Sequence, residues 1–167
     1  SLNKYIQQGS KVSCNDLRNL IVNEFKPVGP IRLEPKRVYW GTGAAPDQVS
    51  FMGEWVGDVL LDEGCKAEVN KWLKRLTYYE VEREEIGDVL PGAYVLKVRD
   101  IYREGAKHVK ITDVGFGISQ VLPLVAQLVA AKESIITIEQ PESQIHPRMQ
   151  ADFAELVVWS MKENKNQ

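Results

Sequence analysis

The chain has few of the residues that build disulfide frameworks or metal centres. Its 167 residues include two cysteines, Cys14 and Cys65, and two histidines, His108 and His146. Two isolated cysteines exclude a disulfide scaffold, and a histidine without a second histidine or a cysteine nearby is a poor zinc ligand. Free thiols suit a reducing compartment, and the first residues contain no recognisable secretory signal. We therefore expect a cytoplasmic protein.

A strong charge imbalance is also lacking. The formal net charge is -2, and 44% of the residues are hydrophobic while 26% are charged, which is ordinary for a globular domain. This composition excludes a protein-wide basic field that would attract nucleic acid or an anionic membrane, and it leaves a local basic patch open.

One segment, residues 114–131, has no charged side chain and is long enough to suggest a membrane span. It carries glycines, a proline and uncharged polar residues: Gly115, Gly117, Ser119, Gln120, Pro123 and Gln127. Because lipid offers these polar groups no hydrogen-bond partner, we expect a buried helix and no membrane partner.

The first part of the chain mixes helical and extended patterns. Residues 14–25 have apolar positions at helical spacing, and residues 26–48 are rich in Pro and Gly, which favours a short strand around Ile31 and Leu33 and then a loop. Residues 53–64 and 66–76 predict two helices separated at Gly64. Their apolar stripes are Trp55, Val59 and Leu60, and Val69, Trp72, Leu73 and Leu76.

The pattern then changes from alternating strands to an α/β unit. Residues 76–84, 93–101 and 108–114 alternate apolar and polar residues, which predicts antiparallel strands with one wet face. Residues 121–131 predict a helix, 134–139 a strand buried on both faces, and 147–163 a helix with Pro147 in its first turn. We divide the chain into a mixed α+β part, 1–106, and an α/β part, 107–167.

A glycine-bearing turn, "DVGFGISQ" at residues 113–120, leads directly into a predicted helix. Gly115 and Gly117 would allow the backbone to approach a ligand closely, and the free N–H groups of a helix start attract anions. Ser119 and Gln120 add side-chain donors. Such turns are common, so the turn alone is a weak indication of phosphate binding.

The strand at residues 134–139 delivers a carboxylate, Glu139, to its C-terminal end, followed by Gln140, Pro141 and Glu142. Ligands bind at the carboxyl ends of strands in open α/β sheets, and an acid placed there is suited to hold Mg²⁺ beside a nucleotide. A strand that simply reaches the surface and turns is the alternative interpretation.

Taken together, in this order and with one helix between them, the two segments resemble the ABC-type ATPases. The resemblance is to the branch that includes the structural-maintenance-of-chromosomes proteins, the RecF-like repair proteins and many predicted bacterial ATPases. "DVGFGISQVLPLV" is similar to their signature segment, and "IITIEQPESQIHPRMQADFAELV" is similar to their Walker B strand, D-loop and following helix. The clear resemblance covers residues 107–160. It implies a partial P-loop NTPase fold with ATP and Mg²⁺ as cofactors.

The resemblance also implies roles for individual residues. Two heads sandwich two ATP molecules, so a second head, as in a homodimer, is the expected partner. Gly115, Gly117 and Ser119, with Gln120 beside them, would contact the γ-phosphate held by that second head. Glu139 would be the Mg²⁺-associated acid, and His146 would lie in the D-loop between the heads. Gln140 would occupy the position of the catalytic glutamate.

Two departures from the family pattern affect catalysis. An amide at position 140 cannot accept a proton as a carboxylate does, so Gln140 would orient the attacking water, or Glu142 would act as the base. No G-x-x-x-x-G-K-[ST] loop is present, since none of the 12 glycines precedes a lysine. We therefore expect a C-terminal-side fragment of a longer ATPase, inactive alone.

Several residues have simpler interpretations. His146 before Pro147 would cap a helix, and His108 would lie on a solvent face. Arg32, Lys36 and Arg37 lie in a predicted loop and would be solvated, although contact with phosphate or DNA is the alternative. The four tryptophans, Trp40, Trp55, Trp72 and Trp159, would be core or subunit-contact residues.

The sequence therefore predicts the ATP-binding and ATP-hydrolysing head of an ABC-like ATPase. Two alternatives stay open. One is a degenerate ATPase domain that binds an effector protein, with Gln140 marking lost catalysis. The other is an ATP-gated component that binds DNA in repair or anti-phage defence.

Overall fold

The computed structural model describes residues 13–15, 18, 24–32, 34–87, 90–143 and 145–167. Most of the helix predicted at residues 14–25 lies outside these ranges. Its last residue, Phe25, is not helical but begins a strand, β1 (Phe25–Val28). The prediction of a strand around Ile31 is also wrong, because the strand lies several residues earlier; Leu33 lies outside the described residues.

The strand β1 pairs in parallel with β6 (Ile135–Ile138), with Phe25 opposite Ile135 and Val28 opposite Ile138. We expected the 134–139 strand to be buried on both faces, but β6 is half-buried and Thr137 is exposed. In the described part of the chain β6 has one full partner strand, and its other edge is met by the backbone of Gln167, which exchanges hydrogen bonds of 2.9 Å with Ser134 and Ile136. Because the described sheet has only two strands, side chains of a neighbouring strand flank β6 on one side only, which explains the exposure.

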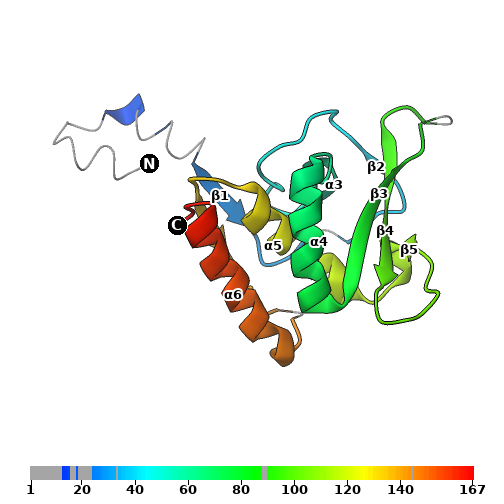
Figure 1. Cartoon of the computed structure of the whole chain (residues 1–167). Helices are drawn as coiled ribbons and strands as arrows, with labels where there is room; N and C mark the ends of the chain where they lie inside the picture. The colour runs from blue at the N-terminus through cyan, green and yellow to red at the C-terminus, as the bar shows by residue number, and fades with distance from the viewer. Residues whose placement is uncertain (1–12, 16–17, 19–23, 33, 88–89, 144) are drawn as a thin grey trace.

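A second sheet is antiparallel, as the alternating pattern predicted (Figure 1). The strand β4 (Ala93–Asp100) pairs along one edge with β3 (Tyr79–Glu85) and along the other with two short strands, β2 (Tyr39–Trp40) and β5 (Val109–Lys110). The strand predicted at residues 108–114 is much shorter than expected, because a 3-10 helix, η1 (Ile111–Asp113), follows β5 immediately.

Four helices beyond residue 50 complete the domain: α3 (Val56–Val59), α4 (Glu63–Thr77), α5 (Phe116–Ala130) and α6 (Pro147–Glu163). The predicted break at Gly64 is wrong, because Gly64 lies in the first turn of α4. Asp62 caps that helix by accepting a hydrogen bond of 2.6 Å from the Cys65 N–H, so the break falls just before Glu63. Trp55 precedes α3 and is exposed rather than part of an inward stripe.

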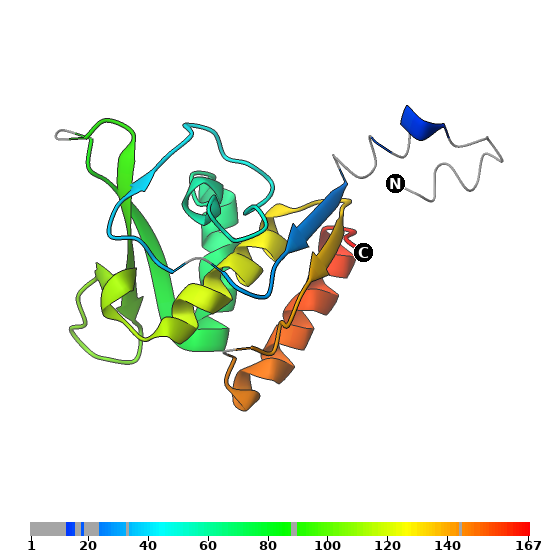
Figure 2. The ribbon, with the colours of Figure 1, turned by 180° about the vertical axis from the view of Figure 1, so that it is seen from behind.

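The centre of the molecule is α5, which packs against α3, α4 and α6. Its residues from Ile118 to Val129 are all buried, as the uncharged run predicted. Figure 2 shows β1 and β6 side by side, with α5 between them and the antiparallel sheet. The result is a mixed α/β fold with one parallel and one antiparallel sheet. None of the helices in the described part of the chain combines the length and apolar character needed to cross a membrane.

Candidate functional site

The candidate site begins at the carboxyl ends of β1 and β6. Because the two strands are parallel, both end at the same edge of their sheet. The Glu139 N–H donates to the Val28 carbonyl at 3.0 Å, which extends the ladder one step beyond β6. The chain then turns sharply, and the Ser143 N–H donates to the Gln140 carbonyl at 3.0 Å.

Gln140 has a φ of 46°, in the left-handed backbone region that residues other than glycine rarely adopt. Such backbone strain is concentrated at functional sites. The turn leaves the side chains of Glu139, Gln140 and Glu142 exposed. The strand end therefore presents two carboxylates and an amide to solvent.

Arg32 is the unexpected member of the site, because it is buried with 1% of its surface exposed rather than solvated. It follows β1, and its Nη2 donates to the Glu139 carbonyl at 3.1 Å. Its Nε and Nη1 are buried and have no partner among the described residues. Burial lowers the pKa of Arg32, and the nearby charge of Glu142 partly opposes this effect. A guanidinium with two unused donors therefore lies behind the acidic turn.

Gln120 connects this site to α5. The side chain is buried, and its Nε2 donates to the Arg32 carbonyl at 3.4 Å. The same residue that the sequence marked as a phosphate donor thus contacts the backbone of the β1 exit segment. Ser119 points elsewhere: it is also buried and lines a small cavity of about 30 Å³ with Gly53, Glu54 and Tyr39.

Gly115, Gly117 and His146 meet in a separate groove of about 480 Å³ between the start of α5, the end of α4 and the start of α6. We call it the α5–α6 groove. Gly115 is the N-cap of α5 with a φ of -60°, and a Cβ added there would have no atom within 4 Å. Neither the backbone conformation nor the packing at position 115 requires a glycine, and the space in front of the start of α5 is open.

His146 caps α6, as its position before Pro147 suggested. Its Nδ1 accepts a hydrogen bond of 3.3 Å from the Arg148 N–H, and the ring is exposed. Capping occupies one ring nitrogen and leaves Nε2 free to interact with a ligand in the groove.

The structure thus divides the predicted site residues into groups. Glu139, Gln140 and Glu142 lie at the strand end with Arg32 and Gln120, whereas Gly115, Gly117 and His146 line the α5–α6 groove. Ser119 joins neither group. Their roles in catalysis, metal binding and nucleotide binding stay predictions.

The sequence named Arg32 as a possible phosphate contact but predicted a solvated side chain, and that prediction is wrong because Arg32 is buried. The available signal was its distance from the strand: with β1 placed at Phe25–Val28, Arg32 falls just beyond a carboxyl end, where ligands bind.

The exposed carboxylates fit a magnesium ion that is bound together with phosphate. Among the described residues, no three histidine, cysteine or acidic side chains gather in a way that could hold a metal ion. Mg²⁺ at nucleotide sites is held by one or two carboxylates together with phosphate oxygens and water, so such a cluster is not required. The unused N–H groups of Arg32 at the same strand end suit an anionic group.

This mixed α/β fold, with parallel strands that end in an acidic turn, is that of a partial P-loop NTPase domain. The profile of one protein family, described as "AAA domain, putative AbiEii toxin, Type IV TA system", matches residues 42–167. The chain belongs to this family, and membership implies nucleotide binding. Neither the curated proteins nor the solved structures contain a significant match to the chain.

Proposed function

We propose that the chain forms part of an ATP-hydrolysing head of the ABC-like type, with its Mg-nucleotide site at the carboxyl end of β6. The observation that carries this proposal is that the buried, incompletely paired Arg32 donates to the Glu139 backbone carbonyl and lies near the charge of Glu142, behind a turn whose acidic side chains are exposed. A buried cation beside a solvent-facing acidic turn is costly for folding, and it suits a site that binds a metal with phosphate.

Each residue has a distinct role in this proposal. Glu139 helps to hold Mg²⁺, whose chemistry when bound is to neutralise phosphate charge. Gln140 orients water, and the strained turn fixes its direction. Glu142 is the alternative proton acceptor. The α5–α6 groove, with Gly115, Gly117 and His146, faces a second copy of the head and the phosphate that it holds.

A specific observation favours a second candidate, a degenerate domain that binds an effector protein. Gln140 stands where the resemblance places a catalytic carboxylate, and the sequence contains no glycine followed by lysine. In this case nucleotide would be bound without turnover. The Gln140→Glu variant separates the two candidates, because only a site otherwise competent for hydrolysis responds to a restored base.

The test is steady-state ATP hydrolysis by the full-length gene product, with nucleotide affinity measured in parallel. Glu139→Gln should lower the rate about 100-fold or more, because the metal loses a charged ligand, and should weaken ATP binding mainly when Mg²⁺ is present. Glu163→Gln is the matched control, since Glu163 is an exposed residue at the end of α6. An unchanged rate in Glu139→Gln would show that the assignment is wrong.

Gly115→Ala tests the groove. Because a Cβ at Gly115 meets nothing within 4 Å and its φ is negative, the variant should fold, with a loss of about 1 kcal/mol or less since glycine is preferred to alanine at an N-cap. A fall in hydrolysis larger than this small loss of stability explains would show that the open space serves a ligand or a second head. Full activity would remove Gly115 from the site.

A further inference from the structure

A second hollow lies beside the α5–α6 groove, on the side of the antiparallel sheet. It measures about 530 Å³ and is formed around the junction of α4 and β3. It shares Thr77, Tyr78, Tyr79 and Arg148 with the α5–α6 groove and adds Asp100 and Tyr102. The two hollows therefore form a continuous surface from the start of α5 to the segment that follows β4.

Two tyrosine rings organise this surface. Tyr78 ends α4 in the left-handed region, with a φ of 66°, and its ring meets that of Tyr102 edge to face at a centroid distance of 4.8 Å. The Arg148 guanidinium lies 5.3 Å from the Tyr78 ring. Tyr102 nevertheless keeps 74% of its surface exposed. We call Tyr78, Tyr102 and Arg148 the tyrosine platform.

The backbone holds the platform in place. The Ile101 N–H donates to the Tyr78 carbonyl at 3.0 Å, and the Tyr102 N–H donates to the Asp100 carboxylate at 2.9 Å. The exposed ring is therefore positioned before any ligand arrives, which lowers the entropy lost on binding.

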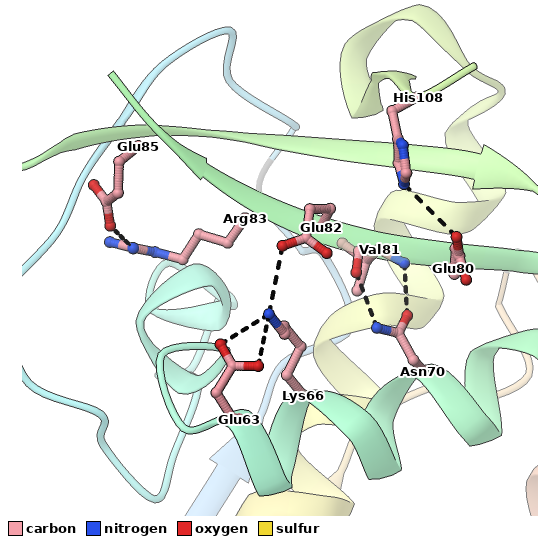
Figure 3. A network of polar contacts seen from close by, with 9 residues as sticks. All are labelled: Glu63, Lys66, Asn70, Glu80, Val81, Glu82, Arg83, Glu85 and His108. Carbon is pink, nitrogen blue, oxygen red and sulfur yellow. Dashed lines mark hydrogen bonds and ion pairs between the residues drawn. The ribbon is translucent and has the colours of Figure 1, made fainter. Parts of the chain in front are cut away.

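The chain around Tyr102 is basic although the protein is not. Residues 97–110 contain five lysines and arginines against two acidic residues, in a chain of net charge -2. Lys97 and Arg99 pair with glutamates on β3, and His108 also lies near one of them, Glu80 (Figure 3). Within the described residues Arg103 and Lys107 are exposed and form no ion pair. Figure 1 shows their segment as a loop that projects beyond β4 and β5.

We propose that the tyrosine platform and the 103–107 loop bind single-stranded nucleic acid, with a base stacked on Tyr102 and phosphates contacted by Arg103 and Lys107. An exposed aromatic ring beside free cations is the combination that recognises unpaired bases on a charged backbone. A duplex hides the faces of its bases, so the platform selects a single strand. Tyr78 and Arg148 also line the α5–α6 groove, whereas Tyr102, Arg103 and Lys107 lie neither in that groove nor at the β6 strand end. Variants of these three residues therefore test this proposal independently of the proposed ATPase.

The experiment is fluorescence anisotropy with a labelled 15-nucleotide oligothymidine, in low salt and without ATP or Mg²⁺. Binding should weaken steeply as salt is raised. Tyr102→Ala should weaken it about tenfold, the effect of losing one stacked base, whereas Tyr102→Phe should retain it. The Arg103→Ala, Lys107→Ala double variant should lower the steepness of log affinity against log salt by about 1.4, since each lost phosphate contact on a single strand removes about 0.7.

Matched control variants distinguish binding at the platform from nonspecific binding to other exposed aromatic or basic residues. Trp40→Ala removes another exposed aromatic, 65% exposed on β2, and should leave affinity unchanged. Lys162→Ala removes an exposed cation at the end of α6 and should leave the salt slope unchanged.

Three results would overturn the proposal: no binding in low salt, equal affinity of wild type and Tyr102→Ala, or tighter binding of a duplex of the same length. Competition by free ATP that disappears in Tyr102→Ala would also overturn it, because the platform would then hold a nucleotide. Thermal melting checks that Tyr102→Ala is folded. If it is not, the Arg103→Ala, Lys107→Ala double variant still tests the proposal, because an unchanged salt slope in that variant would overturn it.

Discussion

The hydrogen bonding of a buried arginine indicates whether its role is structural or functional, and Arg32 is an example. A guanidinium needs five hydrogen-bond acceptors, and burial without them costs free energy. Arg32 makes a single side-chain hydrogen bond, to the Glu139 carbonyl, while two of its nitrogens have no partner in the described residues. Arg83 is a contrast: its side chain is also largely buried and its Nε has no partner in the described residues, but its Nη1 pairs with Glu85 and its guanidinium lies 4.0 Å from the centre of the Tyr94 ring. Stability accounts for Arg83 and does not account for Arg32.

We predict that Arg32→Met retains stability within about 1 kcal/mol, because an apolar side chain of similar length replaces a poorly paired buried charge. Hydrolysis by the full-length protein should fall about tenfold or more, since the Glu139 carbonyl loses its donor. Arg83→Met is the control and should be less stable by about 2 kcal/mol, because it loses an ion pair and a ring contact. The measurements are thermal melting and ATP turnover. A large loss of stability in Arg32→Met with normal turnover would make Arg32 structural.

At the scale of elements, helical periodicity and the pairing of strands close in sequence were predictable, whereas the pairing of distant strands was not. The stripe of α4, from Val69 to Leu76, is buried as its helical spacing predicted, and β3 and β4 pair antiparallel as expected. The expected wet face is wrong for the first half of β4, because its residues from Ala93 to Leu96 are all buried. The strand β1 was misplaced because Pro27 lies inside it and its partner β6 is distant in sequence. A local pattern carries no information on that pairing, so the position of Arg32 at the strand end was not predictable either.

A polar network joins α4 to β3 (Figure 3), and ion pairs join β3 to β4. Asn70 exchanges two hydrogen bonds with the Val81 backbone, at 3.0 and 2.7 Å. Glu80 lies 2.8 Å from the Lys74 ammonium, and it also pairs with Arg99 on β4. The hydrogen bond from Lys74, with a further one from Arg99, lowers the pKa of Glu80 although burial opposes the shift. The stabilisation that the network provides through Glu80 therefore depends on pH.

We predict that Glu80→Gln is less stable than wild type by about 1 kcal/mol at pH 7. Because the folded pKa is lowered, the stabilisation is fully present above the ordinary glutamate pKa of about 4.3 and is lost as the pH falls through the folded value. The difference between the two proteins should therefore shrink below about pH 4. Urea unfolding from pH 3 to pH 7 measures it, with the exposed Glu104→Gln as control. A difference independent of pH would show that shape rather than charge matters at this position.

At the scale of the whole molecule, the strand-end site draws on distant parts of the chain. The family match covers residues 42–167, whereas β1 and Arg32 precede it. The acidic turn was visible in one continuous segment, so sequence reasoning found Glu139, Gln140 and Glu142. The contacts of Arg32 with Glu139 and Gln120 join residues about 107 and 88 positions apart, which only the folded chain reveals. A shift of β6 would therefore move Glu139, Gln140 and Glu142 relative to Arg32.

Asn166 fixes the other end of β6, and it carries the final prediction. Its side chain donates to the Ala131 carbonyl at 2.8 Å and to the Ser160 hydroxyl at 2.9 Å, and it accepts from the Ser134 N–H at 3.0 Å. These contacts join the end of α5, the start of β6 and the body of α6 while Asn166 is only 5% exposed. Truncation leaves buried polar groups without partners, which is more costly than losing the bonds alone.

We predict that Asn166→Ala lowers the free energy of unfolding by about 2 to 3 kcal/mol, which corresponds to a fall in Tm of about 5 to 10 °C for a chain of this size. Gln167→Ala is the control, because Gln167 contributes its backbone to the β6 edge and its side chain is exposed. Asn166→Asp should be intermediate or worse, since it keeps the acceptor and loses both donors. If Asn166→Ala melted at the wild-type temperature, water would have replaced all three hydrogen bonds. The strand β6 would then be held by its pairing with β1 and by packing.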